Sequence, residues 1–121
     1  MYHGIIYEPD QRHFERLETL LKGLEWRVGR ARAADHFEAL VADGAWAGFI
    51  AVLDLVDVLA RITRLRNAGD RGLLLFALLD APNALQDRQL RAAGADGVFV
   101  RPAPESALVD AIVQGMLRRR R

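Results

Sequence analysis

The chain has 121 residues, of which 51% are hydrophobic and 27% charged, and this predicts one globular domain over residues 1–121 rather than a disordered segment. No apolar run approaches the roughly 18 residues of a transmembrane helix, and the amino terminus does not resemble a signal peptide. The absence of cysteine excludes disulfides and thiolate chemistry and favours a cytoplasmic protein, and the lack of a long apolar run predicts no membrane association.

The formal net charge of +1 conceals an uneven distribution of charge. Four of the 17 basic residues are the arginines at 118–121, which leaves 13 basic against 16 acidic residues in the rest of the chain. A domain with an acidic excess is not expected to bind nucleic acid directly. We interpret residues 118–121 as a basic tail or the start of a linker.

Apolar runs and amphipathic stretches alternate from the start of the chain. In residues 11–24 the apolar side chains recur at helical spacing. In residues 26–31 they alternate with Arg27 and Arg30, which is typical of a half-exposed edge strand. The elements predicted for the first half are a strand at 4–7, a helix at 11–24, a strand at 26–31, a helix at 35–42 and a strand at 46–53.

The second half continues the alternation and contains the most apolar run of the chain. Its predicted elements are a helix at 55–65, a strand at 73–79, a helix at 83–93, a strand at 97–100 and a helix at 104–117. Five strand–helix units predict an α/β fold with a flavodoxin-like, doubly wound five-stranded parallel sheet in the order 2-1-3-4-5. In such a sheet the ligand crevice lies at the carboxyl ends of strands one and three.

The segment 89–108, QLRAAGADGVFVRPAPESAL, carries the most specific pattern in the chain. Gly94 suits a left-handed helix cap, Arg101-Pro102 ends a short strand because proline has no N–H for the ladder, and Pro104 suits the first position of a helix. The segment resembles the last third of bacterial response-regulator receiver domains, with their AGADDYLTKP signature before the final helix. This resemblance extends less specifically over the whole chain, and it implies a cis bond at Arg101-Pro102.

The resemblance also implies a set of site positions at the carboxyl ends of the strands. Receiver domains have an acidic pair after strand one, a phosphate-accepting Asp after strand three, a Ser or Thr after strand four and a Lys-Pro after strand five. The corresponding residues are Glu8 and Pro9, with Asp10 one place later, and then Asp54, Ala77, Arg101 and Pro102.

Three of these positions depart from the family pattern. Pro9 has no side-chain ligand atom for Mg²⁺, which requires octahedral oxygen ligands, and Asp10 is shifted by one residue. Ala77 has no hydroxyl to hold a phosphoryl oxygen, and Arg101 keeps the positive charge without the compact ammonium of lysine. We therefore expect a vestigial acidic pocket, with Glu8 and Asp10 in a solvated loop, that binds no metal and uses no cofactor.

Asp54 has three interpretations at this stage. An acidic residue three positions later, Asp57, fits a helix N-cap at Asp54 with a favourable first-turn charge. Alternatively, Asp54 is the phosphate acceptor that the resemblance implies. A third possibility is a shifted alignment, in which Asp54 corresponds to no site residue.

The leading hypothesis is a degenerate receiver, or pseudo-receiver, which is not an enzyme and contacts a protein partner or output domain independently of phosphorylation. The resemblance implies an interaction face, and possible homodimer contacts, on the fourth helix, fifth strand and fifth helix. Charged residues of both signs lie there: Asp87, Arg88, Arg91, Asp96, Glu105 and Asp110. One alternative is a phosphorylatable receiver of two-component signal transduction that uses Asp54, and another is a module that binds a small molecule or nucleotide near Arg101.

Overall fold

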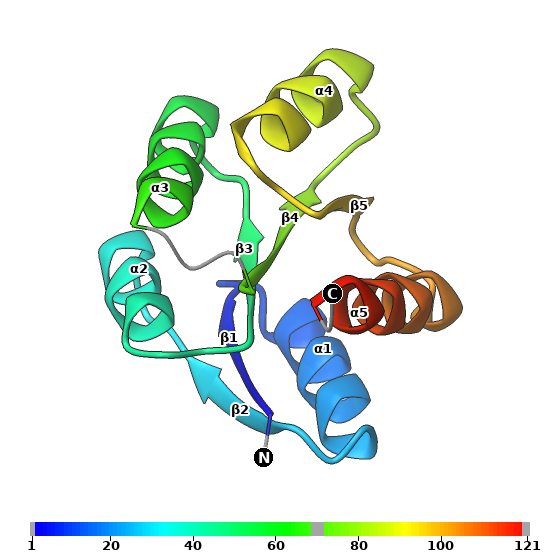
Figure 1. Cartoon of the computed structure of the whole chain (residues 1–121). Coiled ribbons are helices and arrows are strands. Elements are labelled where there is room, and N and C mark those ends of the chain that lie inside the picture. The colour runs from blue at the N-terminus through cyan, green and yellow to red at the C-terminus, as the bar shows by residue number, and fades with distance from the viewer. Residues whose placement is uncertain (1, 69–71, 120–121) are drawn as a thin grey trace.

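The computed structural model describes residues 2–68 and 72–119. Its five strands form one sheet in which all neighbouring strands run parallel (Figure 1). The order β2-β1-β3-β4-β5 confirms the predicted doubly wound topology. The strands are β1 (His3–Tyr7), β2 (Arg27–Arg30), β3 (Ala47–Ala51), β4 (Leu74–Leu79) and β5 (Gly97–Val100).

Helices cover both faces of this sheet. Figure 1 shows α1 and α5 on one face and α2, α3 and α4 on the other. The helices are α1 (Gln11–Gly23), α2 (Ala34–Ala42), α3 (Leu55–Asn67), α4 (Ala84–Ala93) and α5 (Glu105–Arg119). Among the described residues, no helix has both the length and the apolar character that a membrane crossing requires.

The central strands β3 and β4 are buried along their whole length because both of their faces are covered. Alternate residues of β4 enter different cores. Phe76 and Leu78 pack with residues of α1 and α5, whereas Leu75, Ala77 and Leu79 pack with residues of α2, α3 and α4. The edge strand β2 is exposed at both ends and half-buried between them, as its alternating sequence predicted.

Most differences from the predicted boundaries amount to one or two residues. Helix α5 begins at Glu105, one residue after Pro104. The carbonyl of Pro104 accepts the first hydrogen bond of the helix, which the backbone N–H of Leu108 donates. The same helix continues through Arg119, so the basic run begins inside a helix, while residues 120–121 lie outside the described part of the chain. The helix predicted at 55–65 continues to Asn67 as α3.

Two backbone predictions from the segment 89–108 are confirmed. Gly94 follows α4 with a φ of 127°, in the region that favours glycine. A Cβ at this position would also lie 2.5 Å from the side chain of Arg66. The Arg101-Pro102 peptide bond is cis.

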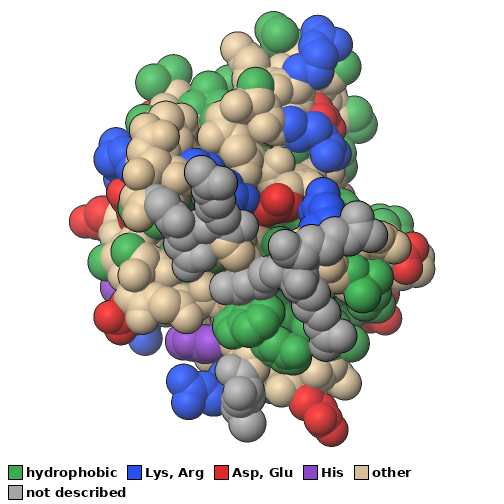
Figure 2. Space-filling view, viewed as in Figure 1, with side chains coloured by type: hydrophobic (Ala, Val, Ile, Leu, Met, Phe, Trp, Pro, Cys, Tyr) green, Lys and Arg blue, Asp and Glu red, His purple; other side chains and the backbone are tan. Residues whose placement is uncertain are grey.

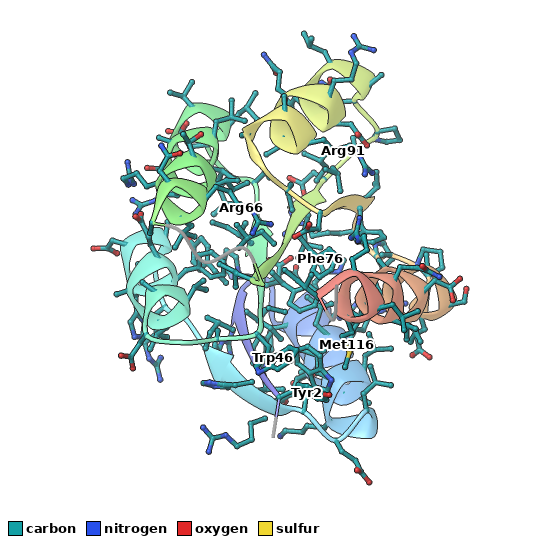
Figure 3. The ribbon with its side chains drawn as sticks, viewed as in Figure 1. Tyr2, Trp46, Arg66, Phe76, Arg91 and Met116 are labelled. Atoms are coloured by element: carbon teal, nitrogen blue, oxygen red, sulfur yellow. The ribbon has the colours of Figure 1, made fainter. Side chains whose placement is uncertain are left out.

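Arg66 connects α3 to the segments that precede β4 and β5 (Figure 3). Its guanidinium donates to the carbonyls of Gly94 and Leu73 at 2.8 and 2.6 Å, and to the Asp96 carboxylate at 2.5 Å. Asp96 in turn accepts from the backbone N–H of Leu75 at 2.8 Å. The Asp96 carboxylate, which was expected on the interaction face, is therefore already engaged within the chain.

We predict that Arg66→Ala lowers the free energy of unfolding by about 2–4 kcal/mol, because two carbonyls lose this donor and the Asp96 carboxylate, which keeps the Leu75 N–H, loses its closest cation. Urea denaturation followed by tryptophan fluorescence measures this change. The matched control is Arg91→Ala, which removes an exposed pair with Asp87 on α4 and should cost no more than about 0.5 kcal/mol. Equal losses in the two variants would contradict a structural role for Arg66.

Candidate functional site

The charged residues that follow the strands lie at one edge of the sheet. Glu8 follows β1, Asp54 follows β3, Asp80 follows β4 and Arg101 follows β5. The parallel arrangement causes this convergence, because all carboxyl ends of a parallel sheet open on the same crevice. Asp80 was not identified from the sequence, although its position directly after the apolar run 73–79 was a usable signal.

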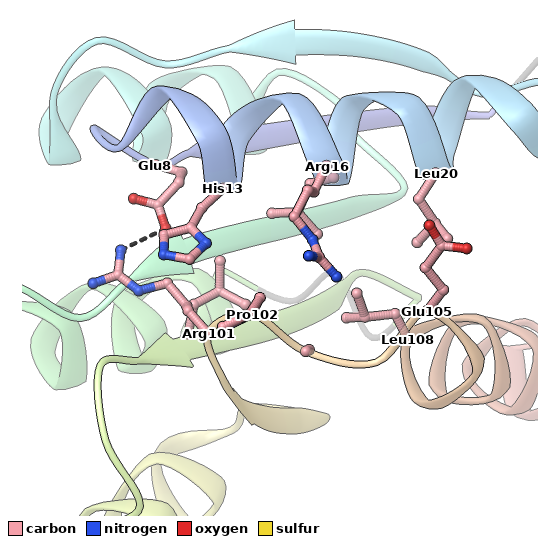
Figure 4. Close-up of a pocket in the computed structure, with 11 residues that line it drawn as sticks. Glu8, His13, Arg16, Leu20, Arg101, Pro102, Glu105 and Leu108 are labelled. Atoms are coloured by element: carbon pink, nitrogen blue, oxygen red, sulfur yellow. Dashed lines mark hydrogen bonds and ion pairs between the residues drawn. The ribbon is translucent and has the colours of Figure 1, made fainter.

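Glu8 and Arg101 form the central contact of this edge (Figure 4). Glu8 is 1% exposed and is the only buried charged residue in the described part of the chain. Arg101 Nη1 lies 2.5 Å from Glu8 Oε1, and the Asp10 backbone N–H donates to Glu8 Oε2 at 3.1 Å. The prediction of a solvated loop is therefore wrong for Glu8, because the carboxylate faces inward and both of its oxygens accept hydrogen bonds from the chain.

The Arg101 guanidinium is held between two carboxylates. Its Nη2 pairs with the exposed Asp80 carboxylate, opposite the contact of Nη1 with Glu8. The Arg101 side chain is only 8% exposed, and its Nε is buried without a hydrogen-bond partner in the described structure. The positive charge therefore lies against the one carboxylate of the family's acidic pair that this chain keeps at its expected position.

Two further carboxylates of the edge serve as helix caps. Asp10 accepts from the His13 N–H at 3.0 Å and caps α1, and this hydrogen bond is the main reason that the pKa of Asp10 is lowered. Asp54 accepts from the Asp57 N–H at 3.2 Å and caps α3. The cap interpretation of Asp54 is confirmed, and Asp54 remains exposed to solvent.

The hydrogen bonds of the residues after β1 decide whether these residues can bind a magnesium ion. Both Glu8 oxygens accept hydrogen bonds from the chain, Pro9 offers no side-chain ligand, and one oxygen of Asp10 caps α1. No group of three or more His, Cys, Asp or Glu side chains suited to a metal ion occurs within residues 2–68 and 72–119. The donor set does not match the octahedral oxygen coordination of Mg²⁺.

Ala77, which the resemblance matched to the Ser or Thr after strand four, is fully buried and lies before the end of β4 at Leu79, so it does not occupy the position after the strand. It lies inside β4, paired with Ile50 of β3 and Val98 of β5, and it packs in the core shared with α2, α3 and α4. The methyl group therefore contributes packing, and the side chain offers no hydrogen-bonding atom.

A narrow pocket with a volume of about 20 Å³ opens beside Arg101, between α1 and the start of α5 (Figure 4). Its walls are mainly apolar and include Leu17, Leu20, Leu78 and Leu108. The polar groups at the pocket are His13, Arg16, Glu105 and the Glu8–Arg101 pair. Pro102, the second residue of the Lys-Pro equivalent, forms part of the wall.

The other residues assigned to an interaction face are distributed over two helices. Asp87 and Arg91 form an ion pair at 2.6 Å along α4, and Arg88 lies exposed between them. Glu105 and Asp110 lie exposed on α5. With Asp96 engaged by Arg66, the mixed-charge face consists of separate groups on α4 and α5.

Comparison with known proteins identifies the fold. No family model matches the sequence, and no protein of curated function does. Among solved structures, a response regulator from Thermotoga maritima has a TM-score of 0.84 at 15% identity, over 96% of this chain and 98% of that chain. A Burkholderia pseudomallei protein described as pilus assembly-related has a TM-score of 0.80 at 21% identity, over 97% of this chain and 90% of that chain.

A third similar structure is the receiver domain of a Saccharomyces cerevisiae response regulator, solved together with a histidine phosphotransfer protein. Its TM-score is 0.81 at 13% identity, over 96% of this chain and 89% of that chain. The chain therefore has the flavodoxin-like receiver fold, which agrees with the resemblance seen in the sequence.

We predict that Arg101→Met lowers the free energy of unfolding by about 3–5 kcal/mol, because it leaves the Glu8 carboxylate buried without its cation. The double variant Glu8→Met/Arg101→Met should recover much of this loss, since it removes both charges together. Urea denaturation of the wild type, both single variants and the double variant measures the coupling. Additive losses would mean that the two side chains do not stabilise one another.

Proposed function

We propose that this chain is a degenerate receiver domain, which acts in the cytoplasm as a phosphorylation-independent signalling module without enzymatic activity. It would work by binding a protein partner or an output domain. The observation that carries the proposal is the Arg101 guanidinium bonded to both Glu8 and Asp80. This guanidinium provides a fixed positive charge among carboxylates, at the place where an active receiver would need a metal ion.

The chemistry of phosphoryl transfer supports this proposal. Transfer to an aspartate depends on cations that neutralise the developing charge on the phosphoryl oxygens. In this chain the guanidinium of Arg101 is shared by two carboxylates, which reduces its attraction for a phosphoryl group. Ala77 offers no hydroxyl and Pro9 no carboxylate, so two further contacts of an active receiver have no side-chain atom to make them.

The fold by itself does not distinguish an active receiver from a degenerate one. The similar structures include response regulators and a protein described as pilus assembly-related. A receiver domain in one of them was solved together with another protein. Protein binding is therefore compatible with the fold, and the residues of the site carry the argument against phosphorylation.

A phosphorylatable Asp54 is the second candidate function. One observation favours it, namely that Asp54 follows β3, is exposed, and uses only Oδ1 for the cap. The third candidate, a module that binds a nucleotide or another anion at the pocket, is disfavoured by charge. Arg16 and Arg101 line the pocket together with the carboxylates of Glu8 and Glu105, and Arg101 is also paired with Asp80, which does not line it.

We predict that acetyl phosphate with Mg²⁺ leaves the intact mass of the protein unchanged, because no site assembles around Asp54. Mass spectrometry is the measurement, with Asp54→Asn as the control for modification elsewhere. A mass increase of one phosphoryl group that Asp54→Asn abolishes would contradict the proposal.

A variant designed to gain phosphorylation tests why the natural chain is expected to remain unmodified. We predict that Pro9→Asp/Arg101→Lys acquires Mg²⁺-dependent phosphorylation at Asp54, since it restores a metal ligand and a compact cation. The matched control adds Asp54→Asn to these two changes. Failure of a folded double variant to react would mean that features other than these two residues prevent phosphorylation.

A further inference from the structure

The edge strand β2 carries main-chain hydrogen-bonding groups that nothing in the described part of the chain uses. It is the last strand on its side of the sheet, and Figure 1 shows no helix or strand beyond it. The N–H groups of Arg27 and Ala31 donate to carbonyls of the neighbouring segment 2–6, both at 2.8 Å. Because these groups alternate between the two sides of a strand, Val28 and Arg30 turn theirs away from β1.

This open edge is short, because the chain itself closes both of its ends. Before β2, the Trp26 N–H donates to the Leu21 carbonyl at 2.9 Å. After β2, the Arg32 N–H donates to Nδ1 of His36 at 3.1 Å. The open groups between these two contacts suit an extended segment of about six residues.

The arginines along this edge have no carboxylate partner among the described residues. Arg27 and Arg32 are exposed and form no ion pair there. The Arg30 guanidinium lies 4.0 Å from the centre of the Phe14 ring and donates to Gln11 at 2.9 Å. This side chain is therefore held beside the strand with its charge uncompensated. Figure 2 shows basic side chains and a histidine over this edge, at the lower left.

The charge of the edge distinguishes among the strands that could pair with it. The stretch 27–32 contains three arginines and no acidic residue, and the exposed carboxylates of Glu25 and Asp35 lie outside it. A second copy of β2 would bring the same arginines against these, and like charges on paired strands are destabilising. An acidic segment instead matches both the open main-chain groups and the arginines.

We propose that the outer edge of β2 binds a short acidic segment of a protein partner, which adds to the sheet as a further strand. Main-chain hydrogen bonds to Val28 and Arg30 hold this segment, and its carboxylates pair with Arg27 and Arg32. The inference rests on the proposed function, because it names the surface and the chemistry by which the interaction module binds its partner. β2 is the edge strand opposite to β5, so the surface is separate from the interaction face that the resemblance implies.

Hydrogen exchange of individual amides tests this pairing directly. The probe is the peptide acetyl-Glu-Thr-Val-Thr-Val-Glu-amide, which favours an extended strand and is acidic at both ends. At saturating peptide, the N–H groups of Val28 and Arg30 should exchange about tenfold more slowly, as measured by NMR. Two control peptides should leave this exchange unchanged: one has lysine in place of both glutamates, and the other is acidic but methylated at its central backbone nitrogens.

Three results would overturn the proposal. One is the absence of slower exchange at peptide concentrations on the order of millimolar, and another is an equal effect of the acidic and the lysine peptide. The third is tighter binding of single-stranded oligothymidylate without slower exchange at Val28 and Arg30. That result would identify the arginines as a contact for nucleic acid phosphates rather than as part of a strand-binding edge.

Charge reversal on the protein separates this edge from a general effect of net charge. Arg27→Glu/Arg32→Glu should raise the dissociation constant of the acidic peptide about tenfold or more in an NMR titration. Arg88→Glu/Arg91→Glu on α4 is the matched control, since it changes the net charge equally and should alter the constant by no more than about twofold. Equal weakening in the two variants would contradict a site at β2. Thermal denaturation checks that both variants keep the fold.

The peptide assay and the phosphorylation assay fail independently. A phosphoryl group on Asp54 would contradict the proposed function whether or not the acidic peptide binds. Loss of peptide binding would remove the β2 edge as the docking surface, and it would leave the argument from the Arg101 ion pairs unchanged.

Discussion

A buried carboxylate needs a cation within hydrogen-bonding distance, and this requirement organises the functional edge of the protein. Glu8 is enclosed where β1 meets α1, and the closest suitable charge comes from the end of β5, 93 residues later in the chain. Arg101 meets this need and also reaches Asp80 after β4. One guanidinium thereby connects the ends of three strands, as a metal ion can in a site built from carboxylates.

The scaffold does not depend on the chemistry of this edge. Strands β3 and β4 are stabilised by apolar packing on both faces, and residues such as Phe76 and Leu75 contribute to it whatever follows the strands. The acidic residues Asp10 and Asp54 have local roles as helix caps. A fold of this kind tolerates replacement of its site residues, provided that each buried polar group still has a partner.

The carboxyl edge of the sheet and helix α5 therefore present surfaces of different character. The carboxyl edge of the sheet is closed by ion pairs within the chain, and its pocket beside Arg101 is mostly apolar. Helix α5 instead exposes Val113 and Leu117 with charges at either end.

The amino-acid sequence by itself determined the order and type of the elements, because periodicity and apolar runs are local properties that neighbouring residues share. Local spacing also predicted the cap at Asp54, and the family pattern predicted the cis bond at Arg101-Pro102. Only the tertiary structure decided that Glu8 is buried, that Arg101 neutralises it and that Arg66 engages Asp96. These pairs join residues up to 93 positions apart, and such contacts exist only once the sheet has brought the strand ends together.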